Sequence, residues 1–475
     1  MAAYSVLDFG ATGDNATNDA PAFQKAIDAC TAAGGGTVTV PAGRTYVCGT
    51  FFLKDNVELH IERGAKVIAS PDREHFDAAV RPSCMVCANG ARNIAITGGG
   101  EINGRGPHYM GEKLPHIYRK KGWRPHTIVL IDCVNVTVRD VLIRQSAAWT
   151  LTLEGCEDVV IHGIRLVNDD LIPNDDGIDI CNCRNVRVSD CYVKAGDDAI
   201  VIKAMPNRRG GEVKPCENVT VTGCVLESQS FALNIGCEAK ATMRDMVFDN
   251  LIIRNSHRGA GIHLSHGCDV ENVVFSNMVI ETRLFHPAWW GRGEPIYVVA
   301  IPWTREDTIG AIRHVRFANI LCRGENGVFV YGWTPDKIQD LAFDNVRVEV
   351  DKWTEFAGGQ QDLRPYPGED CTQNILVTHP TAGFYLKNAT DVALRNCSVA
   401  WGPNRQEYFH HALEYDGVKG LVLEGFRGES AWPGKYAAVA GGGRKIGKRI
   451  ESRRRRKRLS PSATRRTRQR RGKRG

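Results

Sequence analysis

This chain of 475 residues contains no run of about 18 apolar residues, which excludes a membrane-spanning helix. Its N-terminus, residues 1–10, lacks the charged and apolar leader of a secretory signal. We therefore expect a cytoplasmic protein, or a secreted one from which a signal has been removed. Cys84 and Cys87 form a lone Cys-x-x-Cys without a matching second half, so we expect no zinc site there.

Acidic residues are almost absent from the C-terminal end. Residues 444–475 contain 17 Lys or Arg and only Glu451, a net charge of +16, which leaves residues 1–443 at −9. The end has no aromatic residue and no apolar periodicity, so we predict a folded domain over 1–443 and a basic disordered tail over 444–475. Such a tail could bind a polyanion, but we do not expect nucleic acid to be the partner.

A short pattern recurs along most of the chain: a polar residue, an apolar residue, any residue and another apolar residue. Clear copies begin at Asn135, Asp158, Asn185, Asn218, Asp245, Asn272 and His314, with spacings of 23, 27, 33, 27, 27 and 42 residues. Turn residues often follow, at Asp140, Gly163, Asp190, Gly223 and Asn250, and weaker copies begin at Asn56, Asn93, Asp340 and Asp391. Each copy alternates with period two and is rich in β-branched residues, as in a strand with one buried face. The repeat predicts an all-β solenoid, with a strand in every coil.

The longest regular gap, between Asn272 and His314, predicts an insertion that projects from one face of the solenoid. It contains Trp289, Trp290 and Arg292. Two adjacent residues of an extended segment cannot both point inward, so one of the two tryptophans is a candidate for contact with a ligand.

Before the repeats, residues 18–33 have apolar residues on one helical face. We predict an amphipathic helix with Asp19 as its N-cap and Pro21 in its first turn, ended by Gly34 to Gly36. A helix at this position would cover the open edge of the first coil.

Cys191, Cys224 and Cys397 each lie six residues after the start of a strand copy, which predicts repeated interior positions. Free cysteine packs as a small apolar residue, so we expect buried thiols rather than disulfides there. Reduced cysteines agree with a cytosolic setting.

Two aspartate pairs lie between residues 174 and 204: Asp175 with Asp176, and Asp197 with Asp198. Asp176 and Asp197 are 21 residues apart, a length typical of one solenoid turn, so the pairs could lie on neighbouring coils of one surface. A lone aspartate at such a turn is usually structural, because it binds local backbone. Crowded carboxylates instead push their pKa values apart and can divide acid and base roles.

These residues resemble the polygalacturonase-like glycoside hydrolases, glycoside hydrolase family 28, over roughly residues 4–435. The resemblance includes Asp8-Phe-Gly-Ala-Thr-Gly-Asp, Gly34-Gly-Gly-Thr-Val-Thr-Val-Pro-Ala-Gly and Asn56-Val-Glu-Leu-His, and is most specific at Asn174-Asp-Asp-Gly-Ile-Asp and Gly196-Asp-Asp. It implies a right-handed single-stranded parallel β-helix, hydrolysis of a pectin-related glycan without metal or organic cofactor, and a polysaccharide or oligosaccharide as partner.

By this resemblance, Asp197 would be the general acid, and Asp176 and Asp198 would activate the attacking water. The configuration inverts if acid and base stand far enough apart to admit that water. Asp175 replaces the family's threonine. Asp179 suits either a structural turn partner or a residue that supports the catalytic ones.

Two family motifs are absent from this chain. Phe231 replaces the histidine that tunes the acid, and Gly261-Ile-His263 stands where the family has the Arg-Ile-Lys motif that binds a uronate carboxylate. Loss of Arg and Lys removes a charge-assisted fork suited to a carboxylate. Positive charge could come from His263 if it is protonated, or from Arg258, His266 or Arg292. We therefore expect an altered glycoside specificity rather than a standard polygalacturonase. The candidate substrate-binding residues are Asn174, Lys203, Phe231, Arg258, His263, Trp289 and Trp290.

Two other interpretations of the sequence stay open. A polysaccharide lyase or epimerase on the same fold would need a basic residue near the sugar, and often Ca²⁺. A non-enzymatic glycan-binding β-helix would not need the acidic pairs. The sequence does not define the sugar, the endo or exo mode, or the oligomeric state.

Overall fold

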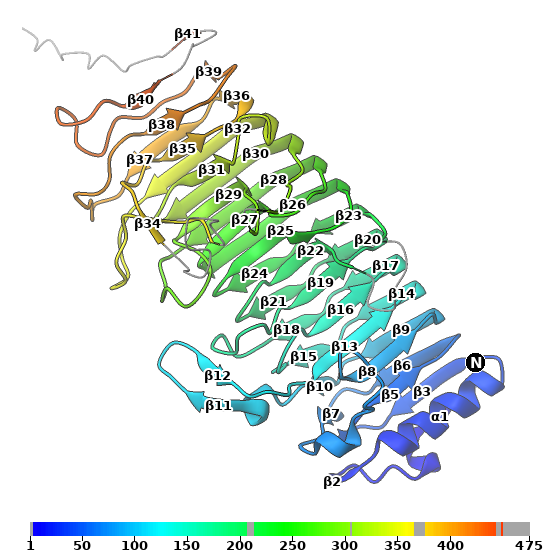
Figure 1. Cartoon of the computed structure of the whole chain (residues 1–475). Helices are drawn as coiled ribbons and strands as arrows, with labels where there is room; N and C mark the ends of the chain where they lie inside the picture. The colour runs from blue at the N-terminus through cyan, green and yellow to red at the C-terminus, as the bar shows by residue number, and fades with distance from the viewer. Residues whose placement is uncertain (1–2, 207–212, 305, 365–375, 443–447, 450–475) are drawn as a thin grey trace, which may run out of the picture.

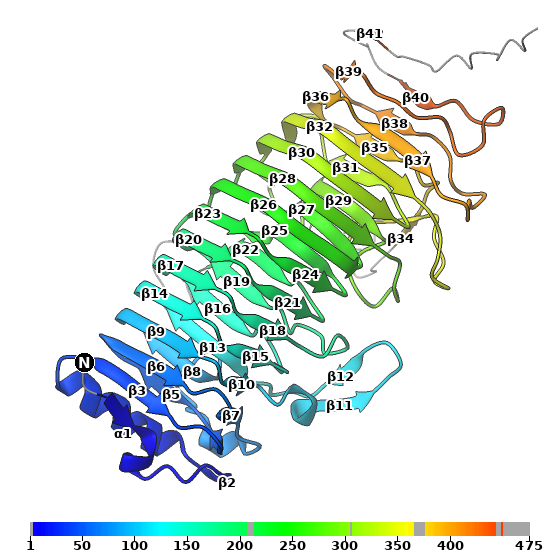
Figure 2. The same ribbon diagram turned by 180° about the vertical axis from the view of Figure 1, so that it is seen from behind.

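The computed structural model describes residues 3–206, 213–304, 306–364, 376–442 and 448–449, and they form a parallel β-helix. Figures 1 and 2 show the coils stacked from the N-terminal end, in blue, to the C-terminal end, in orange. Crossovers between parallel strands are right-handed in nearly all proteins. The predicted β-solenoid is confirmed.

One parallel sheet forms a complete side of the stack and carries the site described below. In the described part of the chain its order is β5 (Phe51–Leu53), β8 (Cys84–Asn89), β13 (His126–Ile131), β16 (Leu151–Glu154), β19 (Ile178–Cys181), β22 (Ile200–Ala204), β25 (Phe231–Ala239), β27 (Arg258–Leu264), β29 (Glu294–Ala300), β31 (Val328–Gly332), β35 (Phe384–Lys387), β38 (Leu413–Asp416) and β40 (Val439–Gly442). We call it the site sheet.

A second sheet forms the rest of the coil wall in two rows that merge in four long strands. The first row contains β1 (Ala3–Ser5), β3 (Gly36–Val40), β6 (Val57–Ile61), β9 (Arg92–Gly98), β14 (Val134–Arg139), β17 (Glu157–His162), β20 (Arg184–Ser189), β23 (Cys216–Thr222), β36 (Thr390–Arg395), β39 (Val422–Glu424) and β41 (Lys448–Arg449). The second row contains β2 (Asp14–Asn18), β4 (Thr45–Cys48), β7 (Lys66–Ala69), β10 (Glu101–Asn103), β15 (Leu142–Arg144), β18 (Arg165–Val167), β21 (Tyr192–Ala195), β24 (Val225–Ser228) and β37 (Ser398–Trp401). The long strands are β26 (Met243–Ser256), β28 (Val270–Thr282), β30 (Ile312–Gly324) and β32 (Ile338–Val350).

Short elements interrupt the coils. Three 3₁₀ turns are η1 (Val6–Phe9), η2 (Arg73–His75) and η3 (Gly106–Tyr109). Two antiparallel pairs lie outside the coil wall: β11 (Met110–Lys113) with β12 (Tyr118–Lys120), and β33 (Gln360–Asp362) with β34 (Leu376–Thr378). The first pair extends away from the stack in Figure 1.

The polar residue that opens each repeat has a left-handed backbone. Its φ is 59° at Asn135 and Asn185 and 57° at Asn218, and the predicted turn residues also have positive φ. Asparagine and aspartate tolerate this conformation better than other non-glycine residues, which explains why they recur. Their side chains also join the coils, because Asn218 Nδ2 donates to Asn185 Oδ1 at 3.1 Å and Asn185 Nδ2 donates to Asp158 Oδ1 at 2.9 Å.

The interior of the stack is filled by apolar residues at the inward positions of every strand. Phe248, Phe275, Phe317 and Phe343 stack coil upon coil, with ring centroids 4.6–5.2 Å apart. Parallel pairing without a register shift places like residues above one another, so each ring packs on the next.

The helix α1 (Ala20–Ala32) covers the first coil at the N-terminal end, as predicted (Figures 1 and 2). Phe23, Ile27 and Cys30 are fully buried against it. Asp19 is the N-cap residue, as predicted, but its side chain does not cap the helix, because its carboxylate accepts hydrogen bonds from the backbone of Thr12 and Gly13. No helix within the described ranges is long and apolar enough to span a membrane.

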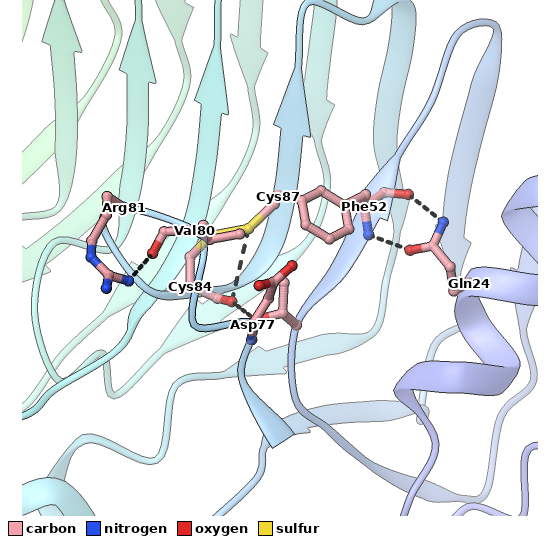
Figure 3. Close-up of a disulfide and its surroundings, with 8 residues drawn as sticks. Gln24, Phe52, Asp77, Val80, Arg81, Cys84 and Cys87 are labelled. Atoms are coloured by element: carbon pink, nitrogen blue, oxygen red, sulfur yellow. Dashed lines mark hydrogen bonds between the residues drawn. A yellow bond between two sulfur atoms is a disulfide. The ribbon is translucent and has the colours of Figure 1, made fainter. Parts of the chain in front are cut away.

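The cysteines follow the prediction with one exception. Cys191, Cys224 and Cys397 are free and buried, as expected. Cys84 and Cys87 instead form a disulfide on the outer face of the site sheet, which Figure 3 shows beside Val80 and Phe52. Their Cα atoms lie 6.4 Å apart, within the range that a disulfide can bridge, so this pair differs from the reduced thiols at the repeated interior positions.

The predicted basic tail lies almost entirely outside the described residues. Only Lys448–Arg449 is described, as β41 paired with β39. The division of the chain at residue 443 therefore stays a prediction.

The left-handed polar residues give a testable prediction at Asn185, whose side chain forms hydrogen bonds with both neighbouring coils. Asn185→Ala should destabilise the protein by about 1–2 kcal/mol, because alanine is strained at positive φ and makes neither side-chain bond. Asn185→Gly, the matched control, loses the same bonds without that strain and should cost less. Denaturant unfolding of both variants measures the difference, and equal losses would contradict a strain contribution.

Candidate active site

The two aspartate pairs meet at the outer face of the site sheet, as their spacing predicts. Asp176 lies just before β19, and Asp197 and Asp198 lie just before β22, the parallel neighbour of β19. They open onto a pocket of about 190 Å³. Its lining residues are Trp149, Asn174, Asp176, Asp197, Asp198, Lys203, Ser230, Phe231, Asn234, Gly236, Cys237, Glu238, Arg258, His263, Trp290 and Trp303.

Lys203 lies at the centre of a buried charge cluster rather than on a solvated rim. Its Nζ is 3.3 Å from Asp176 Oδ2 and 3.2 Å from Asp179 Oδ1, and it sits 3.8 Å from the centroid of the Trp149 ring. Burial alone would lower the pKa of Lys203, but Glu238, Asp176 and Asp179 together raise it well above its usual range. The ammonium therefore stays protonated between two carboxylates. Asp179 is fully buried, is ion-paired with Lys203 and does not line the pocket.

The pKa of Asp176 is raised well above its ordinary value. Burial is the main cause, and the charge of Lys203 acts in the opposite direction. One oxygen of Asp176 faces Lys203, while Oδ1 has no hydrogen-bond partner. Asp176 is thus a fixed and largely buried carboxyl group at the wall of the pocket.

Asp197 is the more exposed member of its pair, and Asn174 positions it. The backbone N–H of Asn174 donates to Asp197 Oδ2 at 3.2 Å, and its Nδ2 donates to the same oxygen at 3.3 Å. Asn174 Oδ1 in turn accepts hydrogen bonds from Lys120 Nζ at 3.2 Å and Arg124 Nη2 at 3.1 Å. The predicted site residue Asn174 therefore contacts the catalytic candidate directly.

Asp198 is held by the neighbouring strand β25. Its Oδ1 accepts a hydrogen bond from the Phe231 N–H at 3.2 Å, and its Oδ2 accepts one from Asn234 Nδ2 at 2.9 Å. Burial, and then the charge of Asp197, raise the pKa of Asp198 to about 7, against the effect of Lys203.

Asp175, beside Asp176 in sequence, has a structural role. It is fully buried, and its Oδ1 accepts hydrogen bonds from the N–H groups of Gly196 at 2.8 Å and Asp197 at 3.0 Å. Burial raises its pKa well above the ordinary value. Asp175 therefore joins the two coils that carry the other three aspartates.

The predicted sources of positive charge behave differently from the expectation. Arg258 lines the pocket, but it is ion-paired with Glu294 at 3.4 Å and Asp362 at 3.1 Å. His263 also lines the pocket, and burial, assisted by Arg258, lowers its pKa to about 3. The hypothesis that a protonated His263 binds a carboxylate is therefore wrong, because the ring is neutral at physiological pH. Arg292 and His266 do not line the pocket.

The two adjacent tryptophans divide as predicted, with one inside the fold and one at the site. Trp289 is 2 % exposed, and its Nε1 donates to the His116 carbonyl at 2.7 Å, so its assignment to the binding site is wrong. Trp290 lines the pocket, and its ring centroid lies 6.3 Å from that of Trp303. These two rings offer an apolar platform at one wall.

Seven lining residues were not predicted: Trp149, Ser230, Asn234, Gly236, Cys237, Glu238 and Trp303. Three of them carried a signal. Side chains alternate along β25, so Asn234 and Gly236 face outward on the same side of the sheet as Val201 of β22. Trp149 lies one coil before Asp176, since the Thr150 N–H donates to the Asp176 carbonyl. Trp303 lies in the loop that follows β29, where no repeat fixes the position.

Among the residues that the structure describes, no group of three or more His, Cys, Asp or Glu side chains is arranged to hold a metal ion. The chemistry available from the described side chains of this pocket is acid and base chemistry by carboxyl groups.

Comparison with known proteins places this site in a family. The model for glycosyl hydrolases family 28 matches residues 30–287, more than half of the chain. A probable polygalacturonase of Vitis vinifera is 26% identical over 315 residues, which cover 61% of this chain and 62% of that protein. The match thus spans less than two thirds of the relative's length.

Two solved structures share the fold. The family 28 exopolygalacturonase of Yersinia enterocolitica has a TM-score of 0.67 at 19% identity, over 88% of this chain and 78% of that one. The hyperthermoactive exopolygalacturonase of Thermotoga maritima has a TM-score of 0.59 at 22% identity, over 89% and 92%. Because the family model covers more than half of the sequence, this chain belongs to the glycosyl hydrolases of family 28.

Proposed function

We propose that this protein is a glycoside hydrolase that cleaves a glycosidic bond of a pectin-related or other plant or microbial polysaccharide or oligosaccharide with inversion. The observation that carries the proposal is the convergence of Asp176, Asp197 and Asp198 on one pocket. Inverting glycosidases need one carboxylic acid to protonate the leaving oxygen and one carboxylate to activate water.

The geometry gives each carboxyl group a distinct role in this proposal. Asp197, partly exposed and positioned by Asn174, would protonate the leaving oxygen. Asp176, which lines the pocket, would accept a proton from the attacking water, with Lys203 favouring the charged form. Asp198, with a pKa of about 7, would share this second role once it is deprotonated.

We further propose that the sugar at the cleavage point is neutral, so that the enzyme is not a standard polygalacturonase. Four carboxyl groups line the pocket, those of Asp176, Asp197, Asp198 and Glu238. Both cations of the lining, Lys203 and Arg258, are already ion-paired with buried carboxylates. A galacturonate would meet excess negative charge there, whereas Phe231, Trp290 and Trp303 offer apolar surface to a neutral ring.

The first prediction tests the general acid. Asp197→Asn should lower kcat by a factor on the order of 10² to 10⁴ without unfolding the protein, because amide nitrogen cannot supply the proton. Asp175→Asn is the matched control, since it keeps the oxygen that accepts from the backbone and should retain most activity. The assay uses pectic oligosaccharides, including rhamnogalacturonan fragments, with products resolved by NMR for anomeric configuration.

Near-normal turnover by a folded Asp197→Asn variant would reject that assignment. Products with retained configuration would reject inversion. An unsaturated, ultraviolet-absorbing product would instead identify a lyase.

A second prediction concerns the charge of the sugar. Hydrolysis of galacturonate oligomers should be less efficient than that of neutral pectic oligosaccharides, and Glu238→Gln should raise kcat/KM severalfold for the uronate alone, because it removes one negative charge. Neither activity should change with pH because of His263 in the range where an ordinary histidine titrates, since the ring of His263 stays neutral there. Efficient cleavage of polygalacturonate that does not respond to Glu238→Gln would contradict a neutral subsite.

A third prediction follows from the pKa of Asp198, about 7 in the folded protein against 3.8 ordinarily. Between these values the folded state holds a proton that the unfolded state lacks, so folding stability falls as pH rises through this window. Asp198→Asn removes the ionisation and should raise Tm at pH 8 relative to the parent, with a smaller effect at pH 4. Thermal melts at the two pH values measure this, and an equal shift at both would contradict the raised pKa.

A further inference from the structure

We propose that the pocket admits only the end of a sugar chain, so that the enzyme removes short products from a chain terminus. This inference rests on the proposed glycosidase function and adds its mode of action. It derives from what lies on the outer face of the site sheet on the C-terminal side of the aspartates.

The floor of the pocket is short. Strand pairing aligns outward residues across the sheet, so that Val201 of β22 is followed by Asn234 of β25 and Gly261 of β27. The next residue in this row is Tyr297 of β29, which is fully buried. From β22 to β27 there are two strand spacings, about 10 Å. A polymer running along the sheet would have to continue over β29.

That continuation is occupied by an aromatic stack. The rings of Tyr297, Phe329 and Tyr385 lie on β29, β31 and β35, with successive centroids 5.6 and 5.3 Å apart. Phe231 joins this stack to the pocket, because its ring meets that of Tyr297 edge to face at 5.8 Å while it also lines the pocket. The residue that replaces the family histidine thus forms the boundary between open pocket and covered face.

Residues within and next to the antiparallel pair of β33 and β34 cover the stack. Leu363, which follows β33, is buried in the same apolar cluster, and Val377 of β34 packs against it. All three rings of the stack are less than 10 % exposed. The chain's own residues therefore occupy the surface that additional sugar units would need.

Buried ionic contacts fix this cover to the wall of the pocket. Asp362 of β33 is ion-paired with Arg258 at 3.1 Å and Arg364 at 2.7 Å, and its Oδ2 accepts a hydrogen bond from the Gly291 N–H at 2.7 Å. The Tyr297 hydroxyl donates to the Asp362 carbonyl at 2.8 Å. Four segments meet at this one residue, so the cover is a built part of the fold.

The side of the pocket near Trp290 is bounded as well. In the turn between β11 and β12, the His116 ring stacks on His286 of the insertion, with centroids 3.3 Å apart. The His116 carbonyl also accepts the indole N–H of Trp289. The contact between His116 and His286 joins segments 170 residues apart and holds the insertion that carries Trp290 in place.

The test uses the intact protein and pectic polymers from the substrate panel. We expect short products from the first time point, with no fragments of intermediate length and little early fall in viscosity. Oligosaccharides carrying a bulky fluorophore at one terminus or the other provide the second readout. A label at the terminus that enters the pocket should lower cleavage by at least about 10-fold, and a label at the opposite terminus should change it less than about twofold.

A matched pair of variants adds a third readout. Trp303 and Trp333 are 37% and 38% exposed and follow the neighbouring strands β29 and β31, but only Trp303 lines the pocket. Trp303→Ala should raise KM about 5-fold, and Trp333→Ala should change KM by less than twofold. We expect these effects to be the same with polymers and with short oligomers as substrates.

Intermediate fragments early in the digestion, cleavage indifferent to both terminal labels, or equal effects of the two tryptophan variants would each overturn the chain-end inference while leaving the glycosidase function intact. No cleavage of any glycan, together with no binding of labelled oligosaccharides to Asp197→Asn, would overturn the proposed function itself and the inference with it.

Discussion

Coil-to-coil register is the constraint on which this molecule depends. Parallel pairing sets each strand beside its counterpart in the next coil, and left-handed polar residues, such as Asn185 and Asn218, recur near the start of the strands and bond to one another between coils. The same register brings Asp176 next to Asp197 and Asp198, although 21 residues separate the two coils. A shift of one residue between β19 and β22 would turn these carboxyl groups to opposite faces. Fold and chemistry therefore share one structural requirement.

The site combines carboxyl groups that differ mainly in burial and partners. Asp175 satisfies backbone donors between coils, Asp176 faces a buried ammonium, and Asp198 is held by an amide and a backbone N–H. These environments raise three pKa values for the same dominant reason, loss of solvent, while Lys203 limits the rise at Asp176 and Asp198. Distinct protonation behaviour thus comes from position along two neighbouring strands rather than from different residue types.

Sequence reasoning succeeded where the repeat applies. The polar residue of each template, the buried thiols at Cys191 and Cys224, and the meeting of the two aspartate pairs all follow from periodicity and from the family resemblance. The same reasoning failed where local pattern does not decide the outcome. Asp19 takes the N-cap position of α1, yet its carboxylate accepts hydrogen bonds from the backbone of Thr12 and Gly13 in the preceding loop and from no helix amide.

Long-range packing explains the other errors. His263 was a reasonable cation on sequence grounds, but Arg258 beside it and the surrounding burial keep it neutral. The ion pair between Arg258 and Asp362 joins residues 104 positions apart, and the sequence repeat gives no indication of that contact. The local sequence does not show which of Trp289 and Trp290 is buried. The contact of Trp289 with His116 places Trp289 inside the fold, and Trp290 lines the pocket. Insertions between coils escape the periodic rules, and the one between Asn272 and His314 contributes Trp290 and Trp303 to the pocket lining.

The disulfide between Cys84 and Cys87 joins two residues of a single strand, only three positions apart. It does not cross-link successive coils, and so short a loop removes little freedom from the unfolded chain. Among the free buried thiols, Cys48 and Cys156 have pKa values raised well above their ordinary range by burial and neighbouring groups, which keeps these two in the unreactive thiol form. Within the described residues, the coils are therefore held to one another by strand pairing and packing rather than by disulfides.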